Sequence, residues 1–241
     1  KNQYWNMALD RIKTIEEAKA QYVETDVDWE DYFYDLIGVT KKVDDEVVKQ
    51  FKVEYKEGEI KKGRNLLAFE VAKRNIFNFL KLELELIEKG DQVQIIALEA
   101  SLENVFDHPN LPYPIKIAGK VDRIETRNGR IRIIDYKTGK VEKTNVSLKQ
   151  WNGLTSDIKN DKIIQILAYA FMYEPHAKGQ EMEVGIISFK NLKSGFLPFN
   201  FKEDIEVISL ISKEIMQKYK EELVVLLNEI LDETIPFIEK T

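Results

Sequence analysis

The sequence contains no cysteine and only two histidines among its 241 residues. Without cysteine, the chain can form no disulfide framework, no thiolate zinc site, no iron–sulfur cluster and no cysteine nucleophile. Two histidines also leave little room for a histidine-rich metal site. The sequence therefore excludes every cysteine-based site.

Long apolar runs are missing as well. The longest, such as Leu223 to Leu227, are far shorter than the roughly 20 residues of a membrane span, and no signal-peptide pattern opens the chain. We therefore expect a cytoplasmic protein without a membrane partner. The sequence has no Gly-x-x-x-x-Gly-Lys-Ser/Thr loop, so we expect neither a nucleotide cofactor nor helicase activity. The first residue is Lys1 rather than Met, which suggests a segment of a longer protein.

Basic residues are fewer than acidic ones, 36 against 42, which gives a formal net charge of -6. This balance excludes a protein that coats nucleic acid with its whole surface, although it leaves room for a local basic patch. The acids concentrate in the first fifty residues and in the C-terminal stretch. By contrast, nine bases face four acids between residues 119 and 150, a local excess of five positive charges.

Hydrophobic periodicity predicts an α/β domain with helical additions at both ends. Helical spacing of apolar residues predicts a long helix over 66–87, closed by Gly90, and a second helix over 159–173. Short helices are expected within residues 1–60, and a helical stretch from 203 to about 232. Strand-type patterns mark four further segments, residues 93–100, 115–125, 130–137 and 183–190.

The most informative segment surrounds Asn128-Gly129, a pair that favours a two-residue type I′ turn because both positions need positive φ. In such a hairpin the numbers of opposed residues sum to a constant, which places Asp122 opposite Asp135. Their Cβ atoms are expected about 4.5 to 5.5 Å apart, where two like charges are destabilising unless a cation lies between them. A divalent metal ion is the obvious candidate.

Strand alternation places Lys137 on the same face as Asp135 and turns Tyr136 to the other side. Two carboxylates and an ammonium group beside apolar neighbours suit metal-assisted hydrolysis of a phosphodiester. The hard oxygen ligands favour Mg²⁺ or Mn²⁺, and the ammonium can position water or stabilise the transition state. The alternative is a solvated hairpin whose aspartates happen to face each other.

These residues resemble the motifs of a known family. Gly119 to Arg123 and Ile133 to Gly139 are similar to the Gly-x-x-Asp-Arg and Asp-Tyr-Lys-Thr-Gly motifs of the PD-(D/E)XK nuclease superfamily, in its RecB-like branch. Gln165 to Tyr169 resembles the Gln-x-x-x-Tyr helix of that branch. The similarity covers roughly residues 93–190, and its context resembles the C-terminal nuclease domain of RecB- or AddB-type helicase-nucleases.

The resemblance implies a restriction-endonuclease-like core of the order αβββαβ, with a mixed sheet flanked by helices. A single nuclease domain over residues 1–241 is then expected, with a helical extension over 1–60, a catalytic core over 63–190 and a C-terminal helical extension over 203–241. It also implies a Mg²⁺- or Mn²⁺-dependent deoxyribonuclease, an exonuclease of DNA recombination or repair. The expected partners are DNA and a helicase portion of the same chain or a partner subunit.

The resemblance also assigns individual roles. Asp122 and Asp135 are expected to bind the metal together with the backbone carbonyl of Tyr136, and Lys137 is expected to be the catalytic lysine. Glu99 is a candidate for an additional carboxylate ligand. Glu70 is a weaker candidate of the same kind.

The motif helix and the basic segment complete the expected site. Gln165 and Tyr169 are expected to orient Lys137 or to touch DNA, unless they merely belong to an ordinary amphipathic helix. The basic residues around the acidic pair, among them Arg123 and Lys140, are expected to hold the phosphate backbone. Trp151 either stacks on a displaced base or is a buried anchor.

One feature of the branch is missing. Many members carry a metal-binding histidine on a helix before the first strand, and this sequence has none there. His108 and His176 both follow or precede a proline and are expected in loops. A non-catalytic module that keeps the fold and binds DNA or a helicase subunit therefore remains the alternative function.

Overall fold

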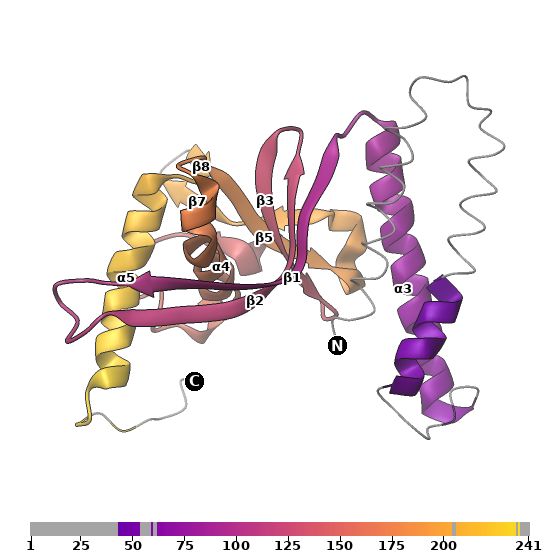
Figure 1. Ribbon diagram of the computed structural model, residues 1–241, viewed down its shortest axis with the longest axis horizontal. Coiled ribbons are helices and arrows are strands. Elements are labelled where there is room, and N and C mark those ends of the chain that lie inside the picture. The colour runs from indigo at the N-terminus through magenta and orange to yellow at the C-terminus, as the bar shows by residue number, and fades with distance from the viewer. Residues whose placement is uncertain (1–42, 54–58, 60–61, 204–205, 235, 237–241) are drawn as a thin grey trace. The chain divides into compact units, whose positions relative to one another are not determined.

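The computed structural model describes residues 43–53, 59, 62–203, 206–234 and 236 (Figure 1). The chain divides into two compact units, residues 1–98 and 99–241. The helices expected within residues 1–42 lie outside the described part. None of the described helices has both the length and the hydropathy that a bilayer crossing requires.

The first unit contains a helix over residues 43–53 and helix α3 (Gly63–Glu88). Apolar residues three to four positions apart line the buried face of α3, so it forms where its sequence pattern predicts. The two helices contact through Phe51 and Phe69, whose rings meet edge to face at 5.8 Å, and through an ion pair of 2.9 Å between Lys73 and Asp44. The predicted helix over 66–87 is thus confirmed, and Gly90 follows it with a φ of 106°.

The second unit is built on a mixed sheet in the order β1-β2-β3-β5-β6, with β9 also paired to β5. Strands β2 and β3 are antiparallel, whereas β3 and β5 are parallel. A smaller sheet has the order β4-β7-β8. The strand bounds are β1 Val93–Phe106, β2 Ile115–Arg127, β3 Arg130–Lys137, β4 Ser147–Leu148, β5 Met182–Ser188, β6 Phe196–Pro198, β7 Asn200–Glu203, β8 Glu206–Ile208 and β9 Leu210–Ile211.

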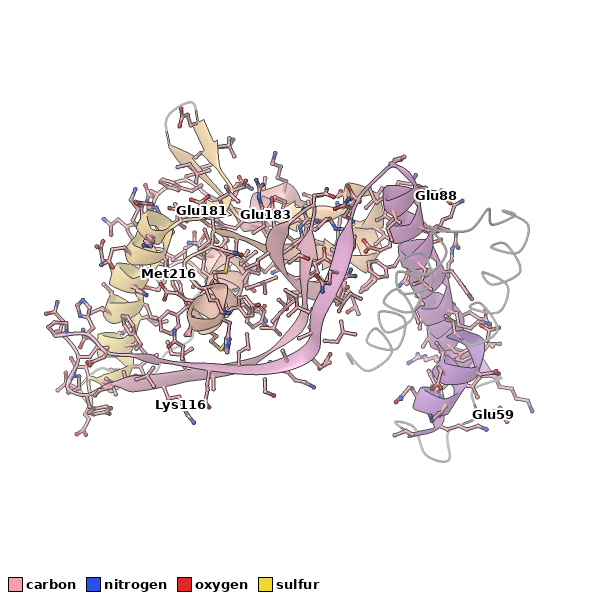
Figure 2. All side chains as sticks on the ribbon, turned by 45° about the horizontal axis from the view of Figure 1, so that its top comes forward. Glu59, Glu88, Lys116, Glu181, Glu183 and Met216 are labelled. Carbon is pink, nitrogen blue, oxygen red and sulfur yellow. The ribbon has the colours of Figure 1, made fainter. Side chains whose placement is uncertain are left out.

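Helix α4 (Asp161–Ala177) packs on β2, β3 and β5, and α5 (Lys213–Leu231) packs on α4. The long β1–β2 hairpin reaches the C-terminal half of α4, where Asn104 Nδ2 donates to the Phe171 carbonyl at 2.8 Å. Met216 is buried on the inner side of α5 (Figure 2). Short 3₁₀ helices complete the unit: η1 Lys143–Val146, η2 Ile158–Asn160 and η3 Phe189–Ser194. The fold is a mixed sheet flanked by helices, as expected.

Two expected elements differ in extent. Strand β1 continues to Phe106 rather than ending near residue 100, because the hairpin packs on α4 and orders the added residues. The C-terminal helix begins only after Ser212, whose hydroxyl accepts the N–H of Ile215, so the prediction of a helix from residue 203 was wrong. The preceding residues form the short strands β8 and β9, which are too brief to show a period in the sequence.

Candidate active site

The β2–β3 hairpin places two aspartates side by side at its open end. Asn128 and Gly129 have φ values of 53° and 79°, as a type I′ turn requires. The register runs from Arg127↔Arg130 to Arg123↔Ile134, so Asp122 and Asp135 are the next opposed positions. The predicted register of the hairpin is confirmed.

Both aspartates are buried, with Asp122 4% and Asp135 3% exposed. The Oδ2 atom of Asp122 accepts the backbone N–H of Tyr136 at 2.7 Å. Burial raises the pKa of Asp122 from 3.8 to about 6; the Tyr136 N–H opposes this rise, and the charges of Asp135 and Glu99 add to it. Asp122 therefore sits in an environment that favours either a proton or a cation.

Asp135 belongs to a closed ring of four polar side chains. Lys137 Nζ lies 2.7 Å from Asp135 Oδ2 and donates to Gln165 Oε1 at 2.8 Å. Gln165 Nε2 donates to the Tyr169 hydroxyl at 2.7 Å, and that hydroxyl lies 3.4 Å from Asp135 Oδ1. The ring fixes the orientation of the Lys137 ammonium group toward Asp135.

The ring also explains two shifted acidities. Burial raises the pKa of Asp135, while the hydrogen bond and charge of Lys137 oppose that rise. Burial together with the charge of Asp135 raises the pKa of the Tyr169 hydroxyl, which therefore stays protonated and able to donate. The structure thus brings together Asp122, Asp135, Lys137, Gln165 and Tyr169, as the sequence motifs suggest.

Glu99 approaches this centre from β1. Its φ of 49° is a left-handed conformation within a strand, which is uncommon for a residue other than glycine. One carboxylate oxygen, Oε2, pairs with Lys120 at 2.5 Å, while Oε1 is buried without a hydrogen-bond partner. Because its charge raises the pKa of Asp122, Glu99 lies within electrostatic range of the pair.

The donor set fits a hard divalent cation. Buried carboxylates with raised pKa values are relieved of their mutual repulsion when a cation binds between them, and Mg²⁺ and Mn²⁺ prefer oxygen ligands. In the part of the chain that the structure describes, no three His, Cys, Asp or Glu side chains already surround one point. Asp122 and Asp135 are thus the pair best placed to hold an ion, with the unpartnered oxygen of Glu99 as a further donor.

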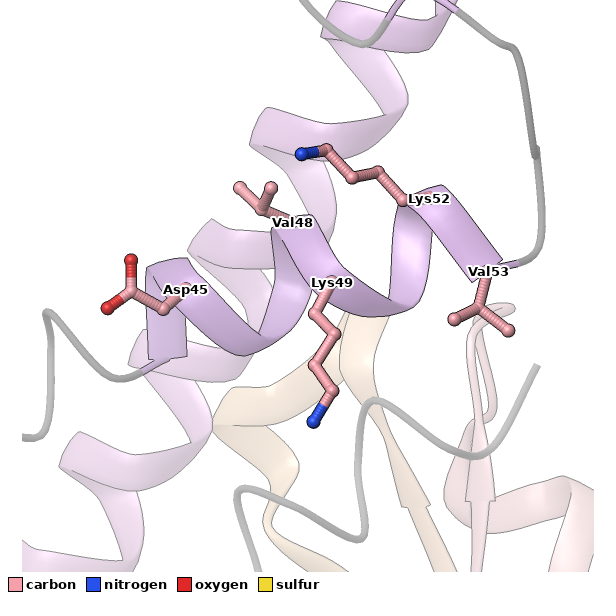
Figure 3. A pocket seen from close by; sticks show the side chains of 5 residues that line it. All are labelled: Asp45, Val48, Lys49, Lys52 and Val53. Atoms are coloured by element: carbon pink, nitrogen blue, oxygen red, sulfur yellow. The ribbon is translucent and has the colours of Figure 1, made fainter.

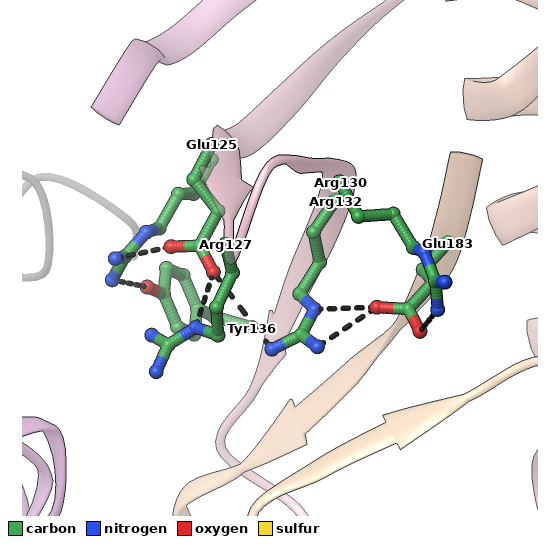
Figure 4. A network of polar contacts seen from close by, with 7 residues as sticks. Glu125, Arg127, Arg130, Arg132, Tyr136 and Glu183 are labelled. Carbon is green, nitrogen blue, oxygen red and sulfur yellow. Dashed lines mark hydrogen bonds and ion pairs between the residues drawn. The ribbon is translucent and has the colours of Figure 1, made fainter. Parts of the chain in front are cut away.

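The opposite face of the same hairpin carries a buried ionic network rather than a basic surface. Glu125 pairs with Arg123, with Arg127 at 2.9 Å and with Arg132 at 3.9 Å (Figure 4). Arg132 in turn donates to Glu183 of β5 at 2.8 and 3.0 Å. Arg123 and Glu125 are both 0% exposed.

This network corrects the role expected for Arg123. A fully buried guanidinium, paired with Glu125 and turned away from Asp122, cannot contact a phosphate backbone. The count of charges between residues 119 and 150 included Arg123 in the expected DNA-binding surface. Such a count does not show which charged side chains are buried against a partner. Lys140, in contrast, is exposed and pairs with Glu142 at 2.5 Å, so its expected DNA contact stays a prediction.

The remaining candidates lie elsewhere. Trp151 is half-buried, and its ring centroid lies 6.2 and 5.4 Å from those of Phe199 and Phe201, which favours the anchor alternative. His108 is in a loop as predicted, but His176 lies in the last turn of α4, because Pro175 is accommodated inside that helix.

Glu70 is on α3 in the first unit, where it is mostly exposed and lies 4.0 Å from Lys73. A pocket in the same unit is lined by Asp45, Val48, Lys49, Lys52 and Val53 (Figure 3). With one carboxylate and two lysines, it lacks the paired oxygen ligands of the hairpin site.

Lys162 is a residue near the site that the motifs do not include. It stands three and seven residues before Gln165 and Tyr169, hence on the same face of α4. Its positive charge acts to lower the pKa of Asp135, and its only contact with a carboxylate among the described residues is with the adjacent Asp161 at 3.2 Å. The i, i+3, i+7 spacing in the sequence was the signal that could have identified it.

The chain matches the model of a known protein family. The model of the PD-(D/E)XK nuclease superfamily matches residues 29–241. A search of curated proteins gave no match. Among solved structures, the crystal structure of SSO0001 is 14% identical, with 80% of this chain and 88% of that chain covered and a TM-score of 0.25. At that TM-score the likeness carries no statement about fold or function.

Proposed function

We propose that this chain, which belongs to the PD-(D/E)XK nuclease superfamily, hydrolyses phosphodiester bonds in DNA with Mg²⁺ or Mn²⁺. The observation that carries the proposal is the buried pair Asp122 and Asp135 with the Lys137 ammonium 2.7 Å from Asp135. Apolar packing gives no reason to bury two carboxylates beside a partly exposed lysine. Their burial is understandable if a cation and an anionic substrate meet there.

Each residue has a role that follows from its surroundings. Asp122 and Asp135 would hold the ion, with the carbonyl of Tyr136 and the free oxygen of Glu99 as further ligands. When bound, the ion would lower the pKa of a water molecule and neutralise charge on the phosphate. Lys137 supplies a positive charge beside Asp135, where it can stabilise the developing phosphate charge or position the water.

Gln165 and Tyr169 support this lysine. Gln165 accepts from the Lys137 ammonium and donates to Tyr169, which leaves the amide one orientation. The lysine is thereby held near the carboxylates instead of extending into solvent. Such fixed orientation lowers the reorganisation that the charge would otherwise need during reaction.

We further propose that the protein is a RecB-like exonuclease of DNA recombination or repair, a single nuclease domain that works with a helicase portion of a longer chain or a partner subunit. The three ordered motifs support this branch: Gly119 to Arg123, Ile133 to Gly139 and Gln165 to Tyr169. We propose Lys140, which is exposed, and Lys162, which lies on the site face of α4, as contacts for the DNA phosphates.

A nuclease assay tests the proposal. Linear single- and double-stranded DNA would be incubated with Mg²⁺, Mn²⁺ or EDTA, and we expect degradation only with metal. Asp135→Ala and Lys137→Met should lower kcat by roughly 10²- to 10³-fold. Lys220→Met is the matched control, because Lys220 is similarly buried and pairs with Glu174 at 2.8 Å on the outer side of α4. Equal rates in all four proteins would exclude the proposal.

A catalytically inactive module of the same fold is the second candidate. It is favoured by helix α3, whose residues include no histidine where many members of the branch carry a ligand. Titration with Mn²⁺ separates the two functions. If the wild-type protein binds DNA but shows no Mn²⁺ binding that depends on Asp122, the inactive module is the correct function.

A further inference from the structure

The residues on the reverse face of the hairpin alternate with the site residues on the same two strands. On β2, Arg123 directly follows Asp122, and on β3, Tyr136 stands between Asp135 and Lys137. Because successive strand residues point to opposite faces, a contact between Arg123 and Tyr136 constrains the backbone that carries both aspartates. The two faces of the hairpin are thus coupled through the backbone that these neighbouring residues share.

Tyr136 joins the two strands at two points. Its hydroxyl accepts from Arg123 Nη1 at 3.3 Å on the reverse face, and its backbone N–H donates to Asp122 Oδ2 at 2.7 Å on the site face. The ring is stacked on Phe189 at 5.4 Å with an angle of 30° between the planes. The Tyr136 side chain is therefore fixed by Arg123 of the neighbouring strand and by Phe189 of η3, which follows β5.

Arg123 is fixed in the same way. Its second terminal nitrogen pairs with Glu125, which is held in turn by Arg127 and Arg132, and Arg132 is bound to β5 through Glu183 (Figure 4). The donor of the bond to Tyr136 thus belongs to a network that spans three strands. Because these charged side chains pair with one another across three strands, the network restrains the Arg123 guanidinium.

This restraint matters at the position where the aspartates lie. The last ladder pair between β2 and β3 is Arg123↔Ile134, and Asp122 and Asp135 follow directly beyond it, where their like charges favour separation of the two strands. On β3, Tyr136 lies two residues beyond Ile134 of that last pair, so its bond to Arg123 ties the two strands together beside the aspartates. The bond opposes the separation of β2 from β3 at this point.

We infer that Arg123 and Tyr136 are positioning residues, which hold β2 and β3, just beyond their last ladder pair, at the separation where Asp122 and Asp135 share one metal ion. The inference rests on the proposed function, since it concerns the geometry of that metal site. It predicts that the Tyr136 hydroxyl affects metal affinity although it lies on the other side of the sheet. A purely structural role predicts an effect on folding stability alone.

Tyr136→Phe tests the inference because it removes one hydroxyl and leaves the aspartates, Lys137 and the stacked ring unchanged. Tyr219→Phe is the matched control, since the Tyr219 hydroxyl is also buried and lies 3.5 Å from the Ile164 carbonyl, away from the site. The dissociation constant for Mn²⁺ would be measured by calorimetry without DNA, together with the melting temperature and kcat at saturating Mn²⁺.

We expect Tyr136→Phe to weaken Mn²⁺ binding by about 10-fold, the size seen when residues behind metal ligands are changed. Tyr219→Phe should leave the Mn²⁺ affinity unchanged even where its melting temperature falls equally. Hydrogen exchange of the hairpin amides should be faster in Tyr136→Phe than in the control. Arg123→Met provides a second variant, in which Glu125 keeps its pairs with Arg127 and Arg132, and it should weaken Mn²⁺ binding at least as much.

The outcomes separate the two claims. A wild-type protein that binds Mn²⁺ and cleaves DNA, with Tyr136→Phe and Arg123→Met both unchanged in Mn²⁺ affinity, overturns the inference and leaves the proposed function standing. A wild-type protein that neither binds Mn²⁺ nor cleaves DNA overturns both.

Discussion

The burial of Asp122 in the site lowers the stability of the metal-free protein at neutral pH. Its carboxyl group is buried near Asp135 and Glu99, and its pKa rises from 3.8 to about 6 as a result. Between these two values the folded protein keeps a proton that the unfolded chain has released. The free energy of unfolding of the metal-free protein therefore falls as pH rises from about 4 to about 6.

Asp122→Asn removes this penalty, because the amide is neutral and its oxygen can still accept the Tyr136 N–H. At pH 7 without metal, we expect the free energy of unfolding to rise by about 1–2 kcal/mol. The gain should shrink as pH approaches 4, where the wild-type carboxyl is protonated. Urea denaturation at both pH values measures it, with the exposed Asp107→Asn as control; a wild-type protein more stable than the variant at pH 7 would contradict the expectation.

Metal affinity should show the opposite dependence on pH. Binding requires ionised carboxylates, so the ion competes with the proton whose pKa on Asp122 is about 6. Below this value the Mn²⁺ affinity should fall by up to about tenfold per pH unit for each proton displaced. Calorimetry between pH 5 and 8 checks this; an affinity that is constant over that range would contradict it.

Lys162 is expected to bind substrate rather than to take part in chemistry. Lys162→Gln should raise KM for DNA about 3- to 10-fold with little change in kcat, and should lower the salt dependence of DNA binding by roughly one phosphate contact. Lys159→Gln, an exposed lysine one helical turn earlier, is the control. A fall in kcat with unchanged KM would assign Lys162 a different role.

At the level of elements, the turn sets the register on which the site depends. Gly129 has a φ of 79°, and no atom would crowd an added Cβ, so the cost of Gly129→Ala is conformational alone. We expect a loss of about 1 kcal/mol. Gly139→Ala is the control, because an added Cβ has similar space there and Gly139 has no positive φ. Equal stability of the two variants would show that a side chain at position 129 does not strain the turn.

The elements that the sequence predicted are those with local signals. Asn128-Gly129 defines a turn within two residues, and the α3 stripe repeats over many turns, so both appear where expected. The strands β6 to β9 are two to four residues long, and β7 and β9 pair with β4 and β5, strands that do not adjoin them in the sequence. Arg132 likewise looked like a surface charge because its partner, Glu183, is in a parallel strand far along the chain.

The same contrast separates the predicted from the unpredicted parts of the site. The opposed aspartates and Lys137 follow from strand alternation, and Gln165 and Tyr169 from a motif. The burial of Arg123 does not, because opposite charges on three strands must first be brought together by the fold. The sequence thus predicted the polar groups on the site face of the hairpin. It did not predict that the charged residues on the reverse face are buried in an ionic network.

At the scale of the whole molecule, metal binding should appear as stability. An ion that binds only the folded state at a hundred times its dissociation constant adds about 2.7 kcal/mol. For a domain of this size, we expect Mn²⁺ to raise Tm by roughly 5–10 °C. Asp135→Asn should show little of this rise, and differential scanning fluorimetry measures it. An equal rise in wild type and variant would place the ion elsewhere.

The central claim is that Asp122 and Asp135 hold one divalent ion. Crystals grown with Mn²⁺ and measured at the manganese absorption edge test it most directly. The account predicts an anomalous peak at roughly 2 Å from a carboxylate oxygen of each aspartate, lost in Asp135→Asn. No peak between these residues at saturating Mn²⁺, or a peak that persists unchanged in the variant, would contradict it.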